Sequence, residues 1–363
     1  MKIIGSVKED LTKEKRIAIT PETVKKYIAL GFSINIEKNY AAHLGINDSD
    51  YENEGANFNK SKEEILKESS IILKVNCPPI DEVNFIKNKS ILISQFDLNK
   101  DKDIISKLIQ KETKNFSLNL LPRITRAQSM DVLSSQANLA GYKAVIESFA
   151  NFEKAIPMMM TAAGTVPAAK VLVVGAGVAG LQAIATAKRM GAIVYATDVR
   201  IASKEQVESL GGKFLTVEDS EDLETQGGYA KETSEDFKKK QEELLAENLK
   251  KIDIVICTAL IPGKKAPLII KETMIKNMKS GSLIYDLAAS QGGNAAFTQV
   301  DKIVNKNGVR IMGERNILNK IPVTASNLYA KNIFNFVQNL FDKESKKINI
   351  NLEDEIIEKT LIK

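Results

Sequence analysis

The stretch Lys170–Arg200, KVLVVGAGVAGLQAIATAKRMGAIVYATDVR, decides the fold. It opens with a β-branched apolar run typical of a fully buried strand, and Gly191 ends the helical pattern that follows. In the turn between them, Gly175 permits the tight bend, Gly177 lets a pyrophosphate approach the backbone, and Gly180 allows close helix–strand packing. This order predicts a Rossmann unit that binds a nucleotide. The alternative is a tight strand–helix turn that holds no ligand.

The second strand of this stretch, Ala192–Val199, carries an acid at its carboxyl end. Asp198 follows the first glycine of the turn by about 20 residues, the distance at which an acid accepts hydrogen bonds from the adenosine ribose. Arg200 argues in the other direction, because an arginine near this position accommodates a 2′-phosphate. We give priority to the acid, which ends the strand, and therefore expect NAD to be preferred over NADP.

Length and composition describe an ordinary globular chain. The 363 residues predict about two domains, and the 44% hydrophobic and 27% charged fractions are typical of soluble proteins. The net charge of +5 comes from basic residues that are mixed with acids, so no nucleic-acid partner is expected. Cys77 and Cys257 lie in or beside strand-like runs and are expected to be reduced. With no signal peptide and no apolar run of spanning length, we expect a soluble, cytoplasmic protein without direct membrane insertion.

The first 120 residues alternate between strand-like and helix-like patterns, without a glycine fingerprint. We therefore expect a first α/β domain. Its predicted helices include Thr20–Leu30, with a proline at the first helical position, and Ser61–Ser70. The strand-like runs are Lys2–Val7, Phe32–Glu37, Ile71–Val75, Ile91–Gln95 and Phe116–Leu121.

The rest of the chain predicts a connector and a second domain. One long helix is expected over 128–155, and a final amphipathic helix over Asn327–Phe341 is expected to pack back on the first domain. The predicted fold is α/β, with two Rossmann-like doubly wound parallel-sheet domains separated by a cleft. The first domain is discontinuous, 1–127 plus 322–363, and the NAD(H)-binding domain covers 156–321. Its strands are expected at 170–175, 192–199, 213–217, 252–259, 282–288 and 309–314.

One connection, at about 218–233, is longer than a compact domain usually contains. It is acidic, and Tyr229 follows the glycine pair Gly227–Gly228. We favour a mobile lid whose tip closes over the bound nucleotide. A passive surface loop is the alternative.

Polar residues precede the predicted connector helix, and ligands of open parallel sheets lie beyond the carboxyl ends of the strands. A nicotinamide carboxamide needs a donor and an acceptor in one plane, which Gln128, Ser134 or backbone groups can supply. Arg123 pairs either with a carboxylate such as Asp131 or with a cofactor phosphate. Alternatively, Arg123 and Asp131 form only a surface ion pair at the start of the helix.

The single histidine, His43, constrains the mechanism, because alcohol and amine dehydrogenases move a proton together with the hydride. His43 lies in an early loop and is expected to be a surface residue. Lys74, at a strand end, either polarises a carbonyl or extends to solvent. No metal-ligand cluster is present. This inventory fits a reaction that needs hydride transfer alone, such as exchange between two nicotinamides.

Several longer motifs point to a known family. Together they resemble the NAD(H)-binding component of proton-translocating nicotinamide nucleotide transhydrogenases, in the wider group that includes alanine dehydrogenases. The resemblance covers nearly the whole chain and is densest from 121 to 294. The motifs are RITRAQSMDVLSSQANLAGYKAV, PMMMTAAGTVPAAKVLVVGAGVAGLQAIATAKRMGA, TDVR, KEQVESLGGKF, GGYAKE, TALIPGKKAPLI and DLAASQGGN, with KEKRIAITP near the amino terminus.

The resemblance implies which residues form the site. The residues that act at the reacting ring are Arg123, Gln128, Asp131, Ser134 and Tyr229. The residues that bind the cofactor are Arg123, Ile124, Thr125, Gln128, Ser129, Met130, Asp131, Gly175, Ala176, Gly177, Val178, Gly180, Asp198, Val199, Arg200, Gly228, Gln241 and Leu260. No metal is expected.

The resemblance also implies a function and partners. A homodimer that binds NAD(H) passes hydride to NADP(H) held on another subunit, and a membrane-spanning subunit couples the transfer to proton translocation. The protein would lie in the cytoplasm, peripheral to the inner membrane. Since the chain reaches Lys363 without a membrane span, we expect the membrane component to be a separate polypeptide.

The sequence departs from the family pattern at one place that bears on the alternative functions. Residues 93–97, ISQFD, stand where alanine dehydrogenases carry a catalytic histidine, although Arg16 and Lys74 remain. An alanine-dehydrogenase-type enzyme that uses Lys74, and a non-catalytic NAD sensor, are the alternative functions.

Overall fold

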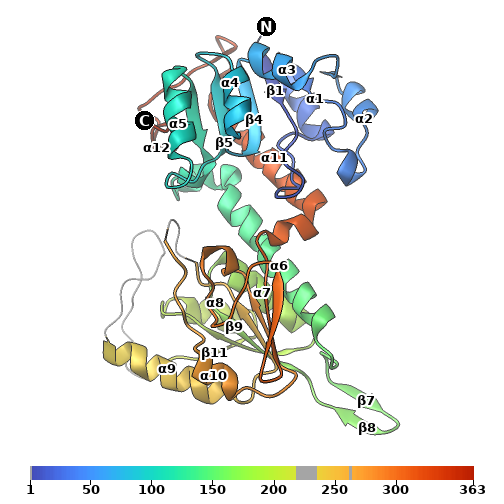
Figure 1. The fold of residues 1–363 in the computed structure, drawn as a ribbon, viewed down its shortest axis with the longest axis vertical. Coiled ribbons are helices and arrows are strands. Elements are labelled where there is room, and N and C mark those ends of the chain that lie inside the picture. Colours follow the sequence, from blue (N-terminus) through green and yellow to red (C-terminus); the bar gives the residue numbers. More distant parts are fainter. Residues whose placement is uncertain (1, 218–234, 261–263) are drawn as a thin grey trace. The chain divides into compact units, whose positions relative to one another are not determined.

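The computed structural model describes residues 2–217, 235–260 and 264–363, which form two compact units. Unit 1 comprises Met1–Gln136 and Leu318–Lys363, and unit 2 comprises Ala137–Ile317. Each unit is built on one twisted sheet with helices on its faces (Figure 1). No helix in the described ranges of the chain is both long and apolar enough to cross a bilayer.

Unit 1 contains a six-stranded sheet in the order β3-β2-β1-β4-β5-β6, and all its strand pairs are parallel. Its apolar strands are buried between the helices, as expected for a parallel sheet covered on both faces. The strands are β1 (Ile3–Ser6), β2 (Ser33–Ile36), β3 (Ala56–Asn57), β4 (Ile71–Asn76), β5 (Ile91–Gln95) and β6 (Lys114–Ser117).

The α-helices of unit 1 include one that returns from the end of the chain. Helix α11 packs Tyr329, Ile333 and Phe336 into the same core as strands β1 and β2. The α-helices are α1 (Pro21–Ala29), α2 (Asp48–Glu52), α3 (Lys62–Glu68), α4 (Ile80–Phe85), α5 (Lys102–Gln110), α11 (Pro322–Asn339) and α12 (Glu355–Thr360). Short 3₁₀ helices and a small hairpin complete the unit: η1 (Ala42–Leu44), η2 (Leu118–Leu120), η3 (Thr125–Met130), β16 (Phe341–Asp342) and β17 (Lys347–Ile348).

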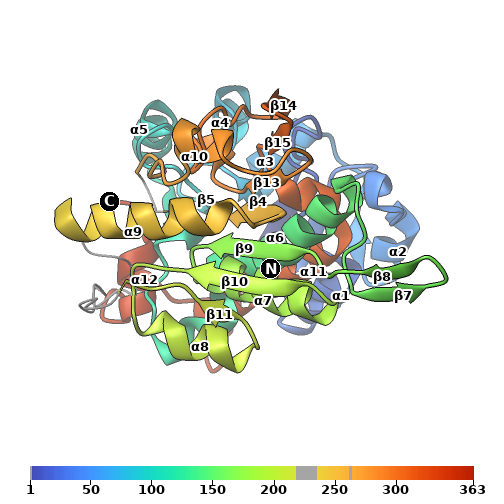
Figure 2. The ribbon, with the colours of Figure 1, turned by 90° about the horizontal axis from the view of Figure 1, so that it is seen from below.

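Unit 2 contains a seven-stranded sheet in the order β11-β10-β9-β12-β13-β15-β14, in which only the edge strand β14 is antiparallel. Figure 2 shows β9, β10 and β11 side by side. The strands are β9 (Lys170–Val174), β10 (Ile193–Thr197), β11 (Lys213–Phe214), β12 (Ile254–Cys257), β13 (Leu283–Asp286), β14 (Lys302–Lys306) and β15 (Val309–Gly313).

Helices cover this sheet, and unit 2 also contains a separate two-stranded hairpin. The hairpin of β7 (Met159–Thr161) and β8 (Gly164–Val166) projects from the body of unit 2 in both ribbon views. The helices are α7 (Val178–Arg189), α8 (Ser203–Ser209), α9 (Glu235–Leu249), α10 (Glu272–Lys276) and the 3₁₀ turn η4 (Ala289–Gln291). Helix α6 (Val132–Asn151) and the 3₁₀ turn η5 (Ile317–Lys320) run from one unit into the other.

The predicted fold class is confirmed, since both sheets are doubly wound and all their strands except the edge strand β14 are parallel. Several element boundaries differ from the prediction. The helix expected over 128–155 is shorter: η3 covers its first turn, and α6 runs only from Val132 to Asn151. The final long helix begins at Pro322, because proline is well suited to the first helical position. The pattern did not predict the two-residue strand β3, the edge strand β14 or the β7–β8 hairpin.

Candidate nucleotide-binding site

The glycine turn joins β9 to α7 at the carboxyl edge of the unit 2 sheet. Gly175 has a φ of 97°, which an L side chain rarely adopts, and its N–H donates to the Thr197 carbonyl at 2.8 Å. Gly177 is the N-cap of α7, and no described atom lies within 4 Å of the place where its Cβ would be. Gly177 lies at the helix N-terminus, where a phosphate is favoured by free N–H groups and the helix dipole.

The turn is packed tightly on its other side. A Cβ added to Gly180 would overlap the Gly175 carbonyl oxygen, and a Cβ added to Gly175 would lie 2.8 Å from the Thr258 Oγ1. The Thr258 hydroxyl donates to the Gly175 carbonyl at 2.8 Å. Thr258 directly follows β12, so the end of a neighbouring strand holds the turn in place. Packing therefore requires glycine at positions 175 and 180, whereas the space beside Gly177 is open.

Asp198 follows β10 and lies beside the turn. Its Oδ2 accepts the Ala176 N–H at 2.7 Å, so the acid and the glycine turn are in direct contact. Arg200 donates to both carboxylate oxygens, from Nε to Oδ1 and from Nη2 to Oδ2, each at 2.9 Å. The guanidinium is thus engaged by the acid, which favours the interpretation of Asp198 as the residue that selects the ribose. Val199 lies between these two residues and is half-buried.

The polar segment 123–134 lies in unit 1, where it precedes and begins α6. The Asp131 carboxylate accepts the Ser134 N–H at 2.9 Å and the Ser134 hydroxyl at 2.5 Å, and so it caps the first turn of α6. Arg126 pairs with Asp354, ahead of α12. The structure thus brings Asp131 and Ser134 together, and Gln128 is exposed.

Two asparagines that the sequence pattern did not reveal hold this segment. Asn332 and Asn335 of α11 both donate from Nδ2 to the Ser129 carbonyl, at 2.8 and 2.9 Å. Ser135 in turn donates to the Asn332 Oδ1 at 2.7 Å. Two asparagines three residues apart lie on the same face of a helix, so the sequence indicated that they could act together. Their partner becomes clear only in the structure, where α11 lies beside η3. The remaining predicted residues of the segment are the exposed Arg123 and Thr125, the half-buried Ile124 and the buried Met130.

The other predicted contacts lie on separate elements of unit 2. Val178 is 43% exposed at the start of α7, Leu260 is 39% exposed after β12, and Gln241 is half-buried on α9. Gly228 and Tyr229, with the rest of the predicted lid at 218–233, lie outside the described residues.

Unit 1 carries a buried ion-pair network at the carboxyl edge of its own sheet. Lys74 of β4 is 1% exposed and lies 2.8 Å from Glu82 and 3.9 Å from Glu9. Burial raises the pKa of Glu9 to about 7, although the Lys74 charge opposes this shift. Nearby, Glu14 holds the buried Arg16 guanidinium through two bonds of 2.8 Å, which helps to keep the pKa of Glu14 below its usual value despite burial.

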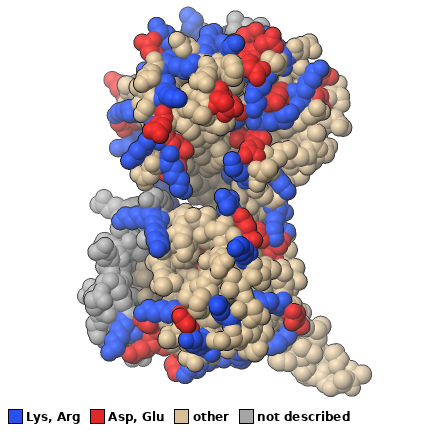
Figure 3. Space-filling view, in the orientation of Figure 1, with Lys and Arg blue, Asp and Glu red and all other residues tan. Residues whose placement is uncertain are grey.

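Other candidate groups are less suited to chemistry. His43 is exposed and its Nε2 lies 2.8 Å from the Lys15 carbonyl oxygen, in agreement with a surface role. Both cysteines are free, and burial raises the pKa of the Cys257 thiol. Within the described ranges no three His, Cys, Asp or Glu side chains come together as a metal site. Basic and acidic side chains are interspersed on the face shown in Figure 3, as the composition indicated.

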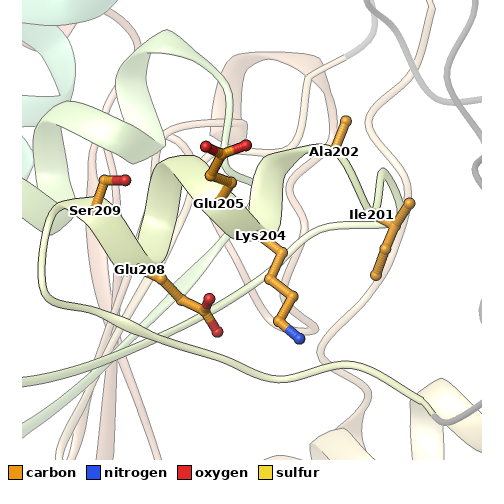
Figure 4. Close-up of a pocket in the computed structure, with 6 residues that line it drawn as sticks. All are labelled: Ile201, Ala202, Lys204, Glu205, Glu208 and Ser209. Atoms are coloured by element: carbon orange, nitrogen blue, oxygen red, sulfur yellow. The ribbon is translucent and has the colours of Figure 1, made fainter.

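A shallow, open pocket lies along α8, beyond Arg200 (Figure 4). It contains none of the glycine-turn residues. Two of its side chains are acidic, a poor environment for a phosphate. Its lining is Ile201, Ala202, Lys204, Glu205, Glu208 and Ser209. The backbone N–H groups of the glycine turn offer an anion better chemistry than this pocket does.

Two family models cover the chain. The N-terminal domain of the alanine dehydrogenase/PNT family matches residues 5–140, and the C-terminal domain matches residues 144–363. The chain therefore belongs to the alanine dehydrogenase/PNT family, a nucleotide-binding group of oxidoreductases.

Individual relatives agree with this assignment. The chain is 48% identical to the first portion of NAD(P) transhydrogenase subunit alpha from Rhodospirillum rubrum, over 99% of this chain and 95% of that protein. It is 45% identical to the protein of the same name from Rickettsia prowazekii, over 100% of this chain and 94% of that one. A transhydrogenase structure from Sinorhizobium meliloti matches with a TM-score of 0.90 and 44% identity, over 99% and 98% of the two chains. The resemblance to transhydrogenases that the sequence motifs indicated is therefore confirmed.

Proposed function

We propose that this chain is the NAD(H)-binding subunit of a proton-translocating transhydrogenase. It binds NADH at the glycine turn of unit 2 and passes a hydride to NADP⁺ held on a partner subunit. A membrane-spanning partner couples this transfer to proton translocation. The observation that supports the proposal most is the open N-terminus of α7 beside Asp198, in a chain that is 48% identical to a transhydrogenase alpha subunit.

The reaction fits the side chains that the protein offers. A hydride that leaves C4 of NADH and joins C4 of NADP⁺ yields NAD⁺ and NADPH, and no proton is released or taken up in that step. The protein then has to position two rings and exclude water, and it needs no general acid. The one histidine, exposed and engaged with a backbone carbonyl, agrees with this requirement.

The segment of unit 1 that precedes α6 is assigned to the nicotinamide ring. This assignment extends the family resemblance to Arg123, Gln128, Asp131 and Ser134, and to Tyr229. The contact of Asp131 with Ser134 and the double anchorage of the Ser129 carbonyl support it, because such bonds hold a loop in one geometry. The domain limits 1–127 plus 322–363 and 156–321 belong to the same proposal.

Replacing Gln128 by Asn tests this role, since it shortens an exposed side chain by one methylene without removing its amide. We expect single-turnover hydride transfer to slow by about tenfold or more while NADH affinity changes little, because small misplacements of reacting atoms cost rate steeply. An unchanged single-turnover rate would remove Gln128 from the site.

Amino-acid oxidation by Lys74 is not supported by its surroundings. The Lys74 ammonium group is buried and paired with Glu82, so a carbonyl substrate would have to displace a buried carboxylate. NADH production from NAD⁺ and alanine by the purified chain would revive this alternative.

Homodimerisation, expected from the family resemblance, has support in the β7–β8 hairpin. Met158, Met159 and Met160 are 64%, 41% and 85% exposed on an element that projects from unit 2. Adjacent exposed apolar side chains of this kind mark protein interfaces. Sedimentation of the wild type and of Met160→Asp tests the idea: we expect a dimer and a weakened dimer, and a monomeric wild type would reject it.

The function is tested by a cofactor titration with and without an NADP-binding transhydrogenase subunit. We expect the isolated chain to bind NADH but to turn over little. The partner subunit is therefore loaded with an NADP⁺ analogue whose reduced form absorbs at a distinct wavelength. Adding it should start hydride transfer, seen in a stopped-flow instrument as the rise of that absorbance. Binding without transfer in the mixture would indicate a nucleotide sensor instead.

A further inference from the structure

The loop that follows β13 is organised around a buried carboxylate for which the proposed hydride transfer has no use. Asp286 is fully buried at the end of β13. It accepts hydrogen bonds from the N–H groups of Ala288, Asn294 and Ala295 and from the Thr298 hydroxyl, at 2.7 to 3.0 Å. Four donors to one side chain fold residues 288–298 around it.

Glycine makes this folding possible. Gly293 has a φ of 81°, and a Cβ there would lie 2.9 Å from the Asp286 Oδ2. The chain therefore passes directly over the carboxylate at this point. The next residue, Asn294, therefore donates its backbone N–H to Asp286, while its side chain bonds to other residues.

The Asn294 side chain is fully buried and uses its amide completely. Its Oδ1 accepts the Ala259 N–H at 3.1 Å, and its Nδ2 donates to the carbonyls of Ala259 at 2.8 Å and Pro267 at 2.9 Å. The Asn294 side chain thus bonds both the N–H and the carbonyl of Ala259, as the backbone of a neighbouring strand would. No other residue type offers a donor and an acceptor in this planar arrangement at this length.

Ala259 lies against the glycine turn together with Thr258. A Cβ added to Gly175 would be 3.2 Å from the Ala259 N and 2.8 Å from the Thr258 Oγ1. Leu260, a predicted cofactor contact, is next in the chain. A continuous series of contacts therefore runs from Asp286 through Asn294 to Ala259 and the turn that we assign to the pyrophosphate.

We propose that Asn294, supported by Asp286, is a positioning residue for the nicotinamide nucleotide: it fixes the backbone at Ala259 and Leu260 against the glycine turn. This inference rests on the proposed nucleotide site. It assigns a role in cofactor binding to the asparagine that ends the DLAASQGGN motif, and it gives the buried Asp286 the task of holding that asparagine in place.

The test compares two buried asparagines of unit 2. Asn248, near the end of α9, donates to the Leu244 carbonyl at 2.8 Å, and it is joined to the amino end of β12, away from the glycine turn. NADH dissociation constants and unfolding midpoints are measured for the wild type, Asn294→Ala, Asn294→Asp, Asn248→Ala and Asn248→Asp. We expect both pairs to be destabilised, but only the Asn294 pair to bind NADH about tenfold more weakly.

The Asn294→Asp variant adds a readout that lost stability alone would not produce. Its new carboxylate would face two carbonyl oxygens in a buried place, so it is expected to bind a proton near neutral pH. The protonated acid donates again to a carbonyl. NADH affinity relative to the wild type should therefore recover as the pH is lowered from 8 to 6, whereas the affinity of Asn248→Asp should follow the wild type throughout.

The outcomes separate this inference from the proposed function. A wild type that does not bind NADH rejects the nucleotide site itself. A wild type that binds, with folded Asn294 variants of equal affinity or with Asn248 variants that weaken equally, rejects only the positioning role. If the Asn294 variants do not fold, Thr298→Val removes one of the four donors to Asp286 at constant volume. An affinity loss of about threefold is then expected, and an unchanged affinity overturns the inference.

Discussion

The two sheets of this protein share one topology and use the same edge in different ways. In both, the first strand lies inside the sheet and the chain crosses from it to neighbours on either side, in the order β3-β2-β1-β4-β5-β6 and β11-β10-β9-β12-β13-β15. In unit 2 the first strand is followed by residues 175–177 and then a helix. In unit 1 it is followed by residues 7–20, which carry buried charged side chains, before α1 begins.

The difference shows that a doubly wound sheet supplies a place for a ligand but not the ligand's chemistry. The carboxyl edge of unit 2 presents backbone N–H groups at a glycine turn. The corresponding edge of unit 1 is filled by Lys74, Arg16 and their glutamates, which neutralise one another. Variants on both edges test this contrast, beginning with the largest expected effect.

Two variants of the glycine turn distinguish the effect of its packing from the effect of its access to a ligand. Gly180→Ala places a methyl group against the Gly175 carbonyl, and we expect an unfolding free energy lower by about 3 kcal/mol or more and NADH binding weaker by over about a hundredfold. Gly177→Ala has open space and a permitted φ of −75°, so its stability should be that of the wild type while NADH binding still falls. Urea unfolding and NADH titration measure both. A stable, binding-competent Gly180→Ala would contradict the account of the turn.

The ion-pair network of unit 1 is expected to serve stability. Lys74→Met removes the buried cation that faces Glu9 and leaves Glu82 with the partly exposed Lys62, and it should lower the unfolding free energy by about 3 kcal/mol. Lys62→Met is the matched control, because Lys62 binds the same Glu82 at 2.8 Å but its side chain is 34% exposed; its cost should be below about 1 kcal/mol. Equal costs in denaturant titrations would mean that burial does not govern this network.

Glu9 makes the stability of unit 1 depend on pH. Its pKa is raised from 4.5 to about 7 in the folded protein, so the folded state holds this proton more tightly than the unfolded chain. The resulting stabilisation is complete below pH 4.5 and is lost as the pH rises through about 7, amounting to about 3 kcal/mol. The groups facing Glu9 are Lys74, Glu14, Glu82 and the Val75 N–H.

Replacing Glu9 by Gln should remove this component. We expect Glu9→Gln to be more stable than the wild type at pH 8 and to have a flatter profile between pH 5 and 8. Thermal unfolding across that range measures the difference. A wild-type profile that rises with pH in parallel with that of the variant would show that Glu9 is charged in the folded protein.

Asp198 should have the smallest effect of the series. Asp198→Asn keeps the shape of the side chain but loses the charge that holds Arg200 at 2.9 Å. We expect the variant to bind NADH about tenfold more weakly than the wild type, and its preference for NADH over NADPH to be smaller. Titration with both nucleotides measures the ratio. Comparable affinity of the wild type for NADPH would show that the acid does not select the cofactor.

Features that depend on residues close together in the chain could be predicted from the sequence. The glycine spacing, the β-branched run and Asp198 all fall within one stretch, so the turn and its acid were found directly. Asn332, Asn335 and Asn294 were missed as positioning residues, because each acts on a backbone carbonyl far away in the chain. The two-residue strand β3 and the edge strand β14 have too little apolar pattern to stand out. The roles of the segment 123–134 at the nicotinamide ring, and of Tyr229, stay predictions.

Hydrogen–deuterium exchange of the complete chain, with and without NADH, tests the central claim most directly. The account predicts that saturating NADH slows exchange most strongly at 175–181, where the turn and the first N–H groups of α7 receive the pyrophosphate, and changes it little at 7–16 in the charged loop of unit 1. The strongest protection at 7–16, or no protection at the glycine turn under conditions where NADH binds, would contradict it.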